Sequence, residues 1–423
     1  MENNLSVTAL EATFRLALSK GLIREEDTLL LFHDLEHLQQ RAGLLKSAFP
    51  PQTLHAVAIK ANPLIRILEL MKPWGTGIEA ATLGEVHLAL EAGYPPEMIV
   101  YDSPVKTPSE IAFALSAGIH LNIDNFSELQ RVEEYLRDHS SASTLGIRIN
   151  PQVGTGTIAE SSVAGEYSKF GIPIRNNRKE LKEAFLANEK LTGVHLHVGS
   201  QGCAMEMLVK GIGILYEFAE EVNRAAGTGR IRTFDIGGGL PVSYRQGSQP
   251  PSMQDYAEAI RKEFPSLFSG KFRLITEFGR WMHVNAGWTV SRVEYVKHDP
   301  GVKTAMIHAG ADLFVRECLN PSDWHHEYSV LDPKGNLKTG RDALLWNLAG
   351  PLCFAGDILA RNVALPPVEE GDWLVIHDTG GYTFSMWSRY NSRQTPRILG
   401  YSGERFVILK EREGLEDIRR AWE

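Results

Sequence analysis

Side chains that can do chemistry recur in this sequence where short apolar segments end. They are Lys60, Glu79, Arg148, His197, Gly237, Gly238, Gly239, Glu277 and Arg280. A lysine such as Lys60 can form a Schiff base with a carbonyl compound once a partly desolvated site lowers its pKa. Taken alone, Lys60 is as readily a surface residue that caps a strand, so its meaning depends on the residues that the fold places beside it.

The glycine run Gly237, Gly238 and Gly239 follows the apolar segment 233–236. Backbone N–H groups in such a run can approach a phosphate closely, although most glycine runs are only tight turns. A position at the end of a late strand of a barrel, where phosphate sites are common, favours the phosphate interpretation.

Two histidines, His195 and His197, flank Leu196 and therefore point to the same side of a strand. Such a pair can bind a metal ion, but no further ligands stand at metal-like spacing in the sequence, so we expect no metal site. Either both are packed histidines, or His197 contacts the face of an aromatic cofactor. In the second case Ser200, in the following loop, is a donor to the cofactor's phosphate.

Glu277 ends the last of the apolar segments, and a buried carboxylate at that position needs a partner. A protonated pyridine nitrogen is one such partner, and the pairing makes pyridoxal 5′-phosphate (PLP) a stronger electron sink. Arg280 could bind a carboxylate or a phosphate in bidentate fashion. The alternative is an ordinary Glu–Arg pair at the surface.

Eight short apolar segments, rich in branched side chains, alternate with helix-like segments. They span residues 54–59, 77–80, 98–101, 120–123, 144–149, 193–198, 233–236 and 272–276. Continuous apolar segments of this length are typical of buried parallel strands. Helix boundaries lie between them; for example, Thr107 with Pro108 starts a helix and Gly118 ends it. Eight such units favour a closed (β/α)8 barrel over an open doubly wound sheet, with the active site at the C-terminal strand ends.

The pattern changes after residue 287 to strand-like segments that are separated by turns. The predicted strands span residues 288–296, 303–308, 372–377 and 405–409, with 28–33 from the start of the chain. This pattern indicates a second, antiparallel β domain. We therefore predict a barrel domain of residues 35–285 and a β-rich domain of residues 1–34 and 286–423.

The composition restricts the kind of partner. The chain has 423 residues, of which 43 % are hydrophobic, and its 44 basic against 52 acidic side chains give a net charge of −8. A mildly acidic chain without a basic block is a poor candidate for binding nucleic acid or an anionic membrane. The three cysteines have no CxxC spacing, and the sequence contains neither a signal peptide nor an apolar stretch long enough for a membrane helix. We expect a cytoplasmic protein without a disulfide framework.

In the order and spacing of these segments, the sequence resembles the alanine racemase-like (fold type III) PLP-dependent decarboxylases, and among them most the diaminopimelate decarboxylases. The resemblance runs from about Thr28 to about Tyr401. The matching segments are AIKAN (58–62), EAATLGE (79–85), RIN (148–150), SKFG (168–171), HVGSQ (197–201), DIGGG (235–239), EFGR (277–280), GPLC (350–353) and GGY (380–382).

The resemblance implies a PLP cofactor and a role for each matched position. Lys60 would bind PLP covalently, His197 would stack on its ring and Glu277 would pair with the ring nitrogen. The other cofactor-binding residues would be Glu79, Arg148, Ser200, Gly237, Gly238, Gly239, Gly279, Arg280 and Tyr382. Cys353 would protonate the carbanion after carbon dioxide leaves. The family works as a homodimer with shared active sites, so Cys353 would come from the partner subunit.

The residues around the far end of the substrate depart from the family pattern. In the diaminopimelate group the cysteine is followed by glutamate, which contacts the distal amino group, and in the ornithine group by aspartate; here Phe354 follows it. The implied substrate-binding residues are Arg280, Arg316, Asn320, Cys353, Phe354 and Tyr382. Arg316 matches an arginine for a distal carboxylate, whereas Asn320 replaces a tyrosine. We expect a diaminopimelate decarboxylase-like enzyme with an altered distal pocket, whose small amino-acid substrate carries a distal carboxylate or carbonyl group. A specialised siderophore or natural-product pathway would fit.

Two alternatives stay open. The first is an amino-acid racemase on the same fold, which needs acid/base groups on both faces of the ring, whereas Cys353 and its segment favour decarboxylation. The second is a non-catalytic regulatory relative without cofactor, against which the presence of Lys60, His197 and Glu277 argues. A metal-dependent barrel hydrolase is a remote third, because the sequence offers no ligand set.

Overall fold

The computed structural model describes residues 4–245, 247–340 and 343–423. The chain forms two compact units. The first, here called the barrel unit, comprises Gln39–Val242 and Pro250–Met282; the second, the β unit, comprises Met1–Leu38, Ser243–Gln249 and His283–Glu423. The domain limits expected from the sequence, 35–285 with 1–34 and 286–423, stay a prediction. Residues 1–3, 246 and 341–342 within those ranges lie outside the described residues.

Eight parallel strands form the closed barrel that the sequence predicts. They are β2 (Leu54–Ala58), β3 (Gly77–Ala80), β4 (Ile99–Asp102), β5 (His120–Ile123), β6 (Leu145–Asn150), β8 (Leu191–His195), β9 (Thr233–Asp235) and β10 (Arg273–Thr276). The order β5-β4-β3-β2-β10-β9-β8-β6 closes through the pairing of β5 with β6. A short strand, β7 (Ile172–Pro173), pairs with β6 outside this ring. The eight-strand barrel and its strand positions are confirmed.

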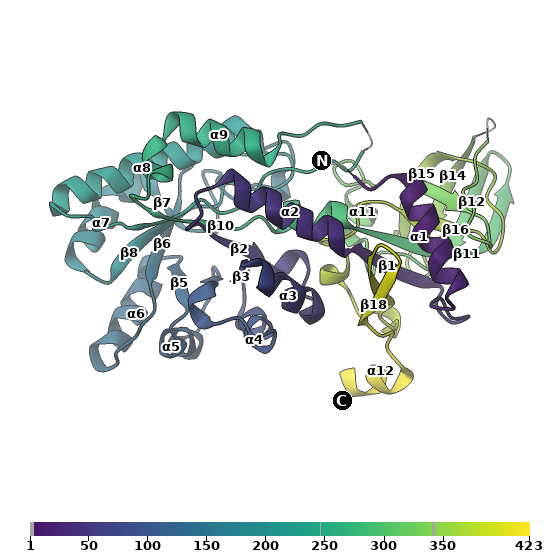
Figure 1. Ribbon diagram of the computed structural model, residues 1–423, viewed down its shortest axis with the longest axis horizontal. Helices are drawn as coiled ribbons and strands as arrows, with labels where there is room; N and C mark the ends of the chain where they lie inside the picture. The colour runs from purple at the N-terminus through teal and green to yellow at the C-terminus, as the bar shows by residue number, and fades with distance from the viewer. Residues whose placement is uncertain (1–3, 246, 341–342) are drawn as a thin grey trace. The chain divides into compact units, whose positions relative to one another are not determined.

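Helices lie outside the ring of barrel strands (Figure 1). They are α3 (Ile65–Met71), α4 (Leu83–Glu91), α5 (Pro108–Ala117), α6 (Phe126–Asp138), α7 (Ile174–Ala187), α8 (Met205–Ala226) and α9 (Met253–Glu263). Two more, α2 (Leu35–Ala48) and α10 (Gly279–His283), include the points where the chain passes between the units. The predicted boundaries of α5 are confirmed: Thr107 and Glu110 form a capping box, and Gly118 follows in the left-handed conformation at φ 83°.

The barrel strands are apolar for a physical reason, since they are covered on both faces. Every residue of β2, β3, β4, β5 and β6 is buried. The few polar groups on these strands therefore need partners inside the barrel. The best places for such groups are the strand ends, where the chain leaves the ring.

The β unit contains one nine-stranded sheet with short helices. Its elements are α1 (Val7–Ser19), β1 (Leu29–Asp34), β11 (Gly287–Asp299), β12 (Val302–Ile307), α11 (Val315–Leu319), β13 (Tyr328–Leu331), β14 (Leu344–Ala349), β15 (Ile358–Leu365), β16 (Trp373–Ile376), β17 (Arg397–Ser402), β18 (Arg405–Lys410) and α12 (Leu415–Ala421). The main path runs β15-β14-β12-β11-β1-β17-β18, and β16 pairs with β11 and β13. Most pairs are antiparallel, as predicted; β1 with β17 and β12 with β14 are parallel.

An aromatic core supports this sheet. Phe32 of β1 stacks on Trp288 of β11 with ring centroids 4.3 Å apart, and Phe14 of α1 meets Trp373 of β16 edge-on at 5.2 Å. Large buried aromatic side chains supply much of the apolar area that a sheet needs to hold one face away from water. In the described part of the chain, no helix combines the length and apolar character that crossing a membrane requires.

Candidate active site

Lys60 and Glu79 form an ion pair at the C-terminal ends of neighbouring barrel strands. Lys60 lies in a short 3-10 helix, Ile59–Ala61, directly after β2, and its Nζ donates to Glu79 Oε2 at 2.5 Å. The Glu79 side chain is fully buried, whereas the Lys60 side chain is 38 % exposed. Burial raises the pKa of Glu79 to about 8 despite the nearby ammonium group. Lys60 is thus reachable from outside while its amine is held by a buried group.

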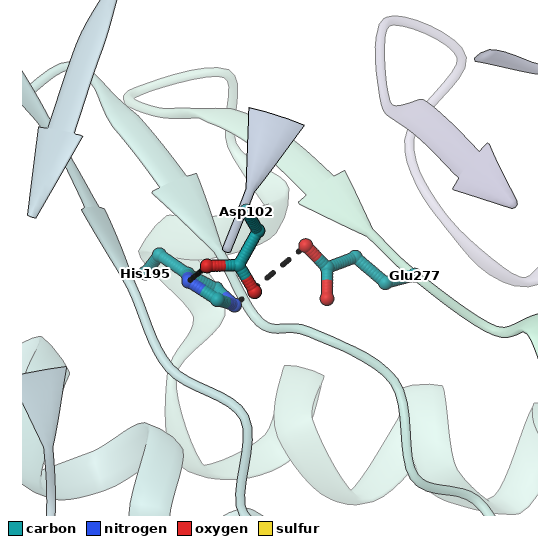
Figure 2. Close-up of side chains that lie close together, drawn as sticks. All are labelled: Asp102, His195 and Glu277. Atoms are coloured by element: carbon teal, nitrogen blue, oxygen red, sulfur yellow. Dashed lines mark ion pairs between the residues drawn. The ribbon is translucent and has the colours of Figure 1, made fainter. Parts of the chain in front are cut away.

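Three further side chains converge in the barrel unit: Asp102 at the end of β4, His195 at the end of β8 and Glu277 just after β10 (Figure 2). His195 Nδ1 lies 3.6 Å from Asp102 Oδ1, and His195 Nε2 lies 3.6 Å from Glu277 Oε1. Arg148 on β6 donates to Asp102 Oδ2 at 2.9 Å. Burial by itself lowers the pKa of His195, but Asp102 and Glu277 outweigh it and raise that pKa to about 9. The cluster is therefore a buried network with cations between its carboxylates.

The same three residues satisfy the distance requirement for a metal site, which the sequence analysis did not foresee. Their ligand atoms all lie within 4.8 Å of one another. Without a metal, a pKa of about 9 makes His195 an imidazolium at neutral pH, so a metal ion would have to displace a proton from one of its nitrogens. The charge on His195 explains the convergence of the carboxylates without an ion.

The Glu277 carboxylate lacks a hydrogen bond on either oxygen, although it is buried. Oε2 lies 3.7 Å from Nδ1 of His197. That Nδ1 accepts a hydrogen bond from the backbone N–H of Gly238 at 3.1 Å, so it has no proton to give to Glu277. Burial raises the pKa of most carboxylates, but His195 outweighs it here and holds the pKa of Glu277 well below its usual range. A buried, ionised carboxylate with an unused oxygen suits a ligand that carries an N–H donor.

Backbone alone forms the cradle beside this carboxylate. Gly237 and Gly239 adopt positive φ values of 64° and 103°. A Cβ at Gly238 would lie 2.5 Å from the Glu277 carbonyl oxygen, and one at Gly239 would collide with the carbonyl of Gly199. Only glycine therefore fits at these positions.

The cradle has polar neighbours on the same unit. Ser200 Oγ accepts a hydrogen bond from Arg280 Nε at 2.9 Å. Gly279 precedes Arg280, and a Cβ on it would lie 2.8 Å from that of Ala58. Asp235, beneath the glycines, accepts from Gly237 N at 2.9 Å, and burial raises its pKa well above the usual value. Backbone N–H groups, a hydroxyl and a guanidinium are groups that can hold a phosphate.

The residues of the barrel unit fit PLP. The cofactor needs a lysine, an acceptor for its ring nitrogen and donors for its phosphate, and it presents a flat ring. Lys60, Glu277 and the glycine cradle could meet these needs, and His197 lies between the carboxylate and the cradle. The unused oxygens of Glu277 are the strongest sign of this fit.

Cys353 lies on an exposed loop of the β unit between β14 and β15. Its backbone N–H donates to Asn391 Oδ1 at 2.8 Å, and its carbonyl accepts from Tyr390 Oη at 3.4 Å. The ring of Phe354 meets that of Tyr390 at 83°, with centroids 6.2 Å apart. Both rings remain exposed, by 39 % and 49 %. Two aromatic side chains thus border the cysteine.

The buried Asp357 fixes the backbone of the Cys353 loop. Its carboxylate accepts backbone hydrogen bonds from Ala311 and Leu352, each at 2.6 Å. Gly310 and Gly350 allow this approach, because a Cβ on either would meet the Asp357 oxygens. One buried carboxylate therefore joins the loop to the segment that follows β12.

Arg316 and Tyr382 are together in the β unit. Arg316 Nη2 donates to the carbonyl of Tyr382 at 2.8 Å, and its guanidinium lies 4.2 Å from the ring of Trp324. Tyr382 has φ 57°, an uncommon conformation for a tyrosine and one that recurs at functional sites. Asn320, in contrast, donates to Asp323 at 2.9 Å. Trp324 and, at 5.7 Å, the ring of Tyr382 supply the aromatic contacts to Arg316, rather than residue 320.

The sequence did not indicate a role for Asp102 or Asp235, and it placed His195 only in a histidine pair without its carboxylate partners. All three are the last residues of barrel strands, so considering every polar strand-end residue would have indicated the cluster. No sequence pattern indicated Asp357 or Asn391, because their importance depends on which loops the fold brings together.

Comparison with known proteins agrees with the geometry. Residues 35–284 match the family described as pyridoxal-dependent decarboxylase, pyridoxal binding domain. The diaminopimelate decarboxylase of Zymomonas mobilis is 31 % identical over 388 residues, which cover 91 % of this chain and 89 % of the relative. That of Helicobacter pylori is 31 % identical over 408 residues, covering 94 % of this chain and 96 % of the relative.

Solved structures give the same result for the fold. The crystal structure of diaminopimelate decarboxylase from Helicobacter pylori complexed with L-lysine superposes with a TM-score of 0.84 at 29 % identity, covering 96 % of this chain and 99 % of that chain. The family match, the relatives and the structure agree with the PLP-compatible barrel mouth described above. The chain therefore belongs to the pyridoxal-dependent decarboxylases of fold type III, enzymes that use PLP to remove carbon dioxide from amino acids.

Proposed function

We propose that this decarboxylase acts on an amino acid whose far end carries a carboxylate or a carbonyl group, without an acidic contact to a distal ammonium. The observation that carries the proposal is the aromatic pair of Phe354 and Tyr390, which borders Cys353 where the resemblance implies a carboxylate. Apolar rings do not compensate the desolvation of an ammonium group, and an unpaired buried charge costs about 2–5 kcal/mol. A specialised pathway, such as siderophore or natural-product assembly, would supply such a substrate.

The roles of the barrel residues follow from their contacts and remain proposals. Lys60 is the attachment point of the cofactor, His197 contacts the ring face and Glu277 accepts from the ring nitrogen. The phosphate is held by Ser200, Gly237, Gly238, Gly239, Gly279 and Arg280, and Tyr382 of the β unit is proposed as a further phosphate contact from the resemblance alone. Glu79 and Arg148 support the site through Lys60 and Asp102. When bound, PLP accepts the electron pair that is released as the carboxylate leaves.

Cys353 is proposed to deliver a proton to Cα after carbon dioxide departs. Its thiol lies on an exposed loop whose backbone is fixed through Asn391 and Asp357, so the sulfur has a defined position. We propose that the enzyme is a homodimer and that Cys353 enters the active site of the partner subunit. The Lys60→Ala and Cys353→Ala variants should each be inactive alone, and mixing them should restore activity through hybrid dimers. An inactive mixture after subunit exchange would contradict shared active sites.

Arg316 is proposed to bind the distal carboxylate or carbonyl of the substrate. Its Nη2 donates to the Tyr382 carbonyl and lies 3.7 Å from Oε1 of the buried Glu317, while the guanidinium lies against Trp324, and a planar guanidinium can still form a bidentate pair with a substrate carboxylate. Arg280, Asn320 and Tyr382 complete the set of proposed substrate contacts.

A panel of amino acids with carbon dioxide detection tests the substrate proposal. We expect slow release from meso-diaminopimelate, ornithine and lysine, and faster release from chain-length analogues whose far end is a carboxylate or an amide. Phe354→Glu should raise kcat/KM for meso-diaminopimelate, whereas Tyr295→Glu, an exposed aromatic elsewhere in the β unit, should not. Efficient turnover of any of the three common substrates by the unaltered protein would contradict the altered pocket.

Two other functions have distinct outcomes in the same experiment. A racemase would invert substrate without releasing carbon dioxide, and a regulatory protein without cofactor would be colourless and would resist labelling by borohydride. Neither is favoured by a specific feature of the structure. We keep the cytoplasm as the proposed location, because Cys203, Cys318 and Cys353 are all unpaired thiols.

A further inference from the structure

His195 is a fully buried histidine of β8 that faces a carboxylate on each side (Figure 2). Its side chain is 0 % exposed, and its two nitrogens each lie 3.6 Å from a carboxylate oxygen, one of Asp102 and one of Glu277. Neither nitrogen makes a hydrogen bond of ordinary length. Both ring nitrogens are therefore directed at negative charge.

Charged and titratable groups from most of the barrel strands surround this ring. They are Asp102 on β4, His120 on β5, Arg148 on β6, Asp235 on β9 and Glu277 after β10, with Lys60, Glu79 and His197 near Glu277. Arg148 is paired with Asp102 at 2.9 Å, and burial keeps Asp235 protonated to a higher pH than usual. Among the described residues, His195 at 3.6 Å and His197 at 3.7 Å are the histidines that approach the Glu277 oxygens, and burial lowers the pKa of His197.

The protonation of His195 decides whether both carboxylates are compensated. A neutral imidazole has one N–H and can donate to Asp102 or to Glu277, but not to both. An imidazolium donates in both directions, and its charge offsets the desolvation of two buried carboxylates. His197 cannot replace it, because its Nδ1 already accepts from Gly238.

We propose that His195 is a positioning residue, which as an imidazolium holds Oε1 of Glu277 and leaves Oε2 oriented for the ring nitrogen of the cofactor. The proposal rests on the pairing of Glu277 with that nitrogen. Asp102 anchors the other side of the ring and is itself anchored by Arg148. The orientation of Glu277 towards the ring nitrogen thus depends on three charged side chains, those of His195, Asp102 and Arg148.

A double-mutant cycle on the dissociation constant of PLP separates this role from a merely structural one. His195→Gln should weaken PLP binding by about 10- to 100-fold in the otherwise unaltered protein, but by less than about threefold when Glu277 is already Gln. Equal losses in the two backgrounds would overturn the proposal. His55→Gln is the matched control, because His55 is also a buried strand histidine, bonded to Thr276, and should leave PLP binding unchanged.

The charge of His195 can be measured without any variant of that residue. In protein labelled with ¹⁵N-histidine, a signal with both nitrogens protonated should persist at pH 8, and the pH at which it loses a proton should fall in Glu277→Gln, where Asp102 is the remaining neighbouring carboxylate. Absence of a signal that responds in this way would refute the imidazolium, and this test decides even if His195→Gln does not fold. Both measurements are independent of turnover, so a failed substrate proposal would leave them interpretable.

Discussion

Asp357 links the Cys353 loop to the rest of the β unit, and replacing it with asparagine tests that link quantitatively. Its two oxygens accept backbone N–H groups of Ala311 and Leu352, each at 2.6 Å, and the residue is 3 % exposed. Asparagine has the same shape but only one acceptor oxygen, so one buried N–H faces an NH2 group instead.

The expected cost follows from these contacts. A buried N–H that loses its acceptor costs about 1–3 kcal/mol, and the surviving hydrogen bond is weakened because its acceptor is no longer charged. Against this, burial raises the pKa of Asp357, so the folded protein is relieved of part of a desolvation penalty when the charge is removed. We expect a net loss of about 2 kcal/mol in the free energy of unfolding.

Urea unfolding followed by tryptophan fluorescence measures this loss, with Asp332→Asn as the matched control. Asp332 also accepts two backbone N–H groups, of Lys334 and Asn336, at 2.8 and 2.9 Å, but in a turn where water can replace it. Its substitution should cost less than about 1 kcal/mol. If Asp357→Asn were no more costly than the control, the loop would not depend on this carboxylate. Carbon dioxide release should also fall in Asp357→Asn, since Cys353 loses its fixed position.

Three further predictions concern the barrel mouth and the distal pocket. Gly239→Ala should abolish tight PLP binding, because φ 103° and the Gly199 carbonyl both exclude a Cβ; Gly227→Ala, with φ 65° and open space, isolates the backbone cost in a PLP titration. The folded pKa of His195, about 9, exceeds its unfolded value of 6.5, so its stabilisation is complete below pH 6.5 and is lost as the pH rises through 9. The difference in unfolding free energy between the unaltered protein and His195→Gln should therefore shrink by about 3 kcal/mol from pH 6 to pH 10, and a constant difference would contradict the charge. Arg316→Lys should raise KM for substrates with a distal carboxylate more than it lowers kcat, because lysine cannot form a bidentate pair; an unchanged KM would exclude Arg316 from substrate binding.

The barrel was predictable from the sequence because its strands are buried on both faces. Mostly apolar segments such as residues 54–59, in which only His55 is polar, indicate such strands, and their order around the ring follows from chain order. The β unit was only partly predictable. Strand β15 buries only Leu359 and Leu365 and does not alternate, so its sequence pattern is weak. Strand β17 pairs with β1 from the opposite end of the chain.

The candidate site was also predictable only in part. Lys60, His197 and Glu277 were predictable because barrel geometry brings all strand ends to one mouth. The ionisation of Glu277 was not, since it depends on His195 being charged, and His195 in turn depends on Asp102 from a strand far away in sequence. The role of Asp357 was also not predictable, because it binds backbone groups of two segments that only the folded chain brings together.

The central claim is that Lys60 binds PLP at the mouth of the barrel. Borohydride reduction of the protein after incubation with PLP, followed by peptide mass mapping, tests it most directly. We expect a phosphopyridoxyl group on the peptide that contains Lys60, and loss of that label in Lys60→Ala. A label on another lysine, or no label in the unaltered protein, would contradict it.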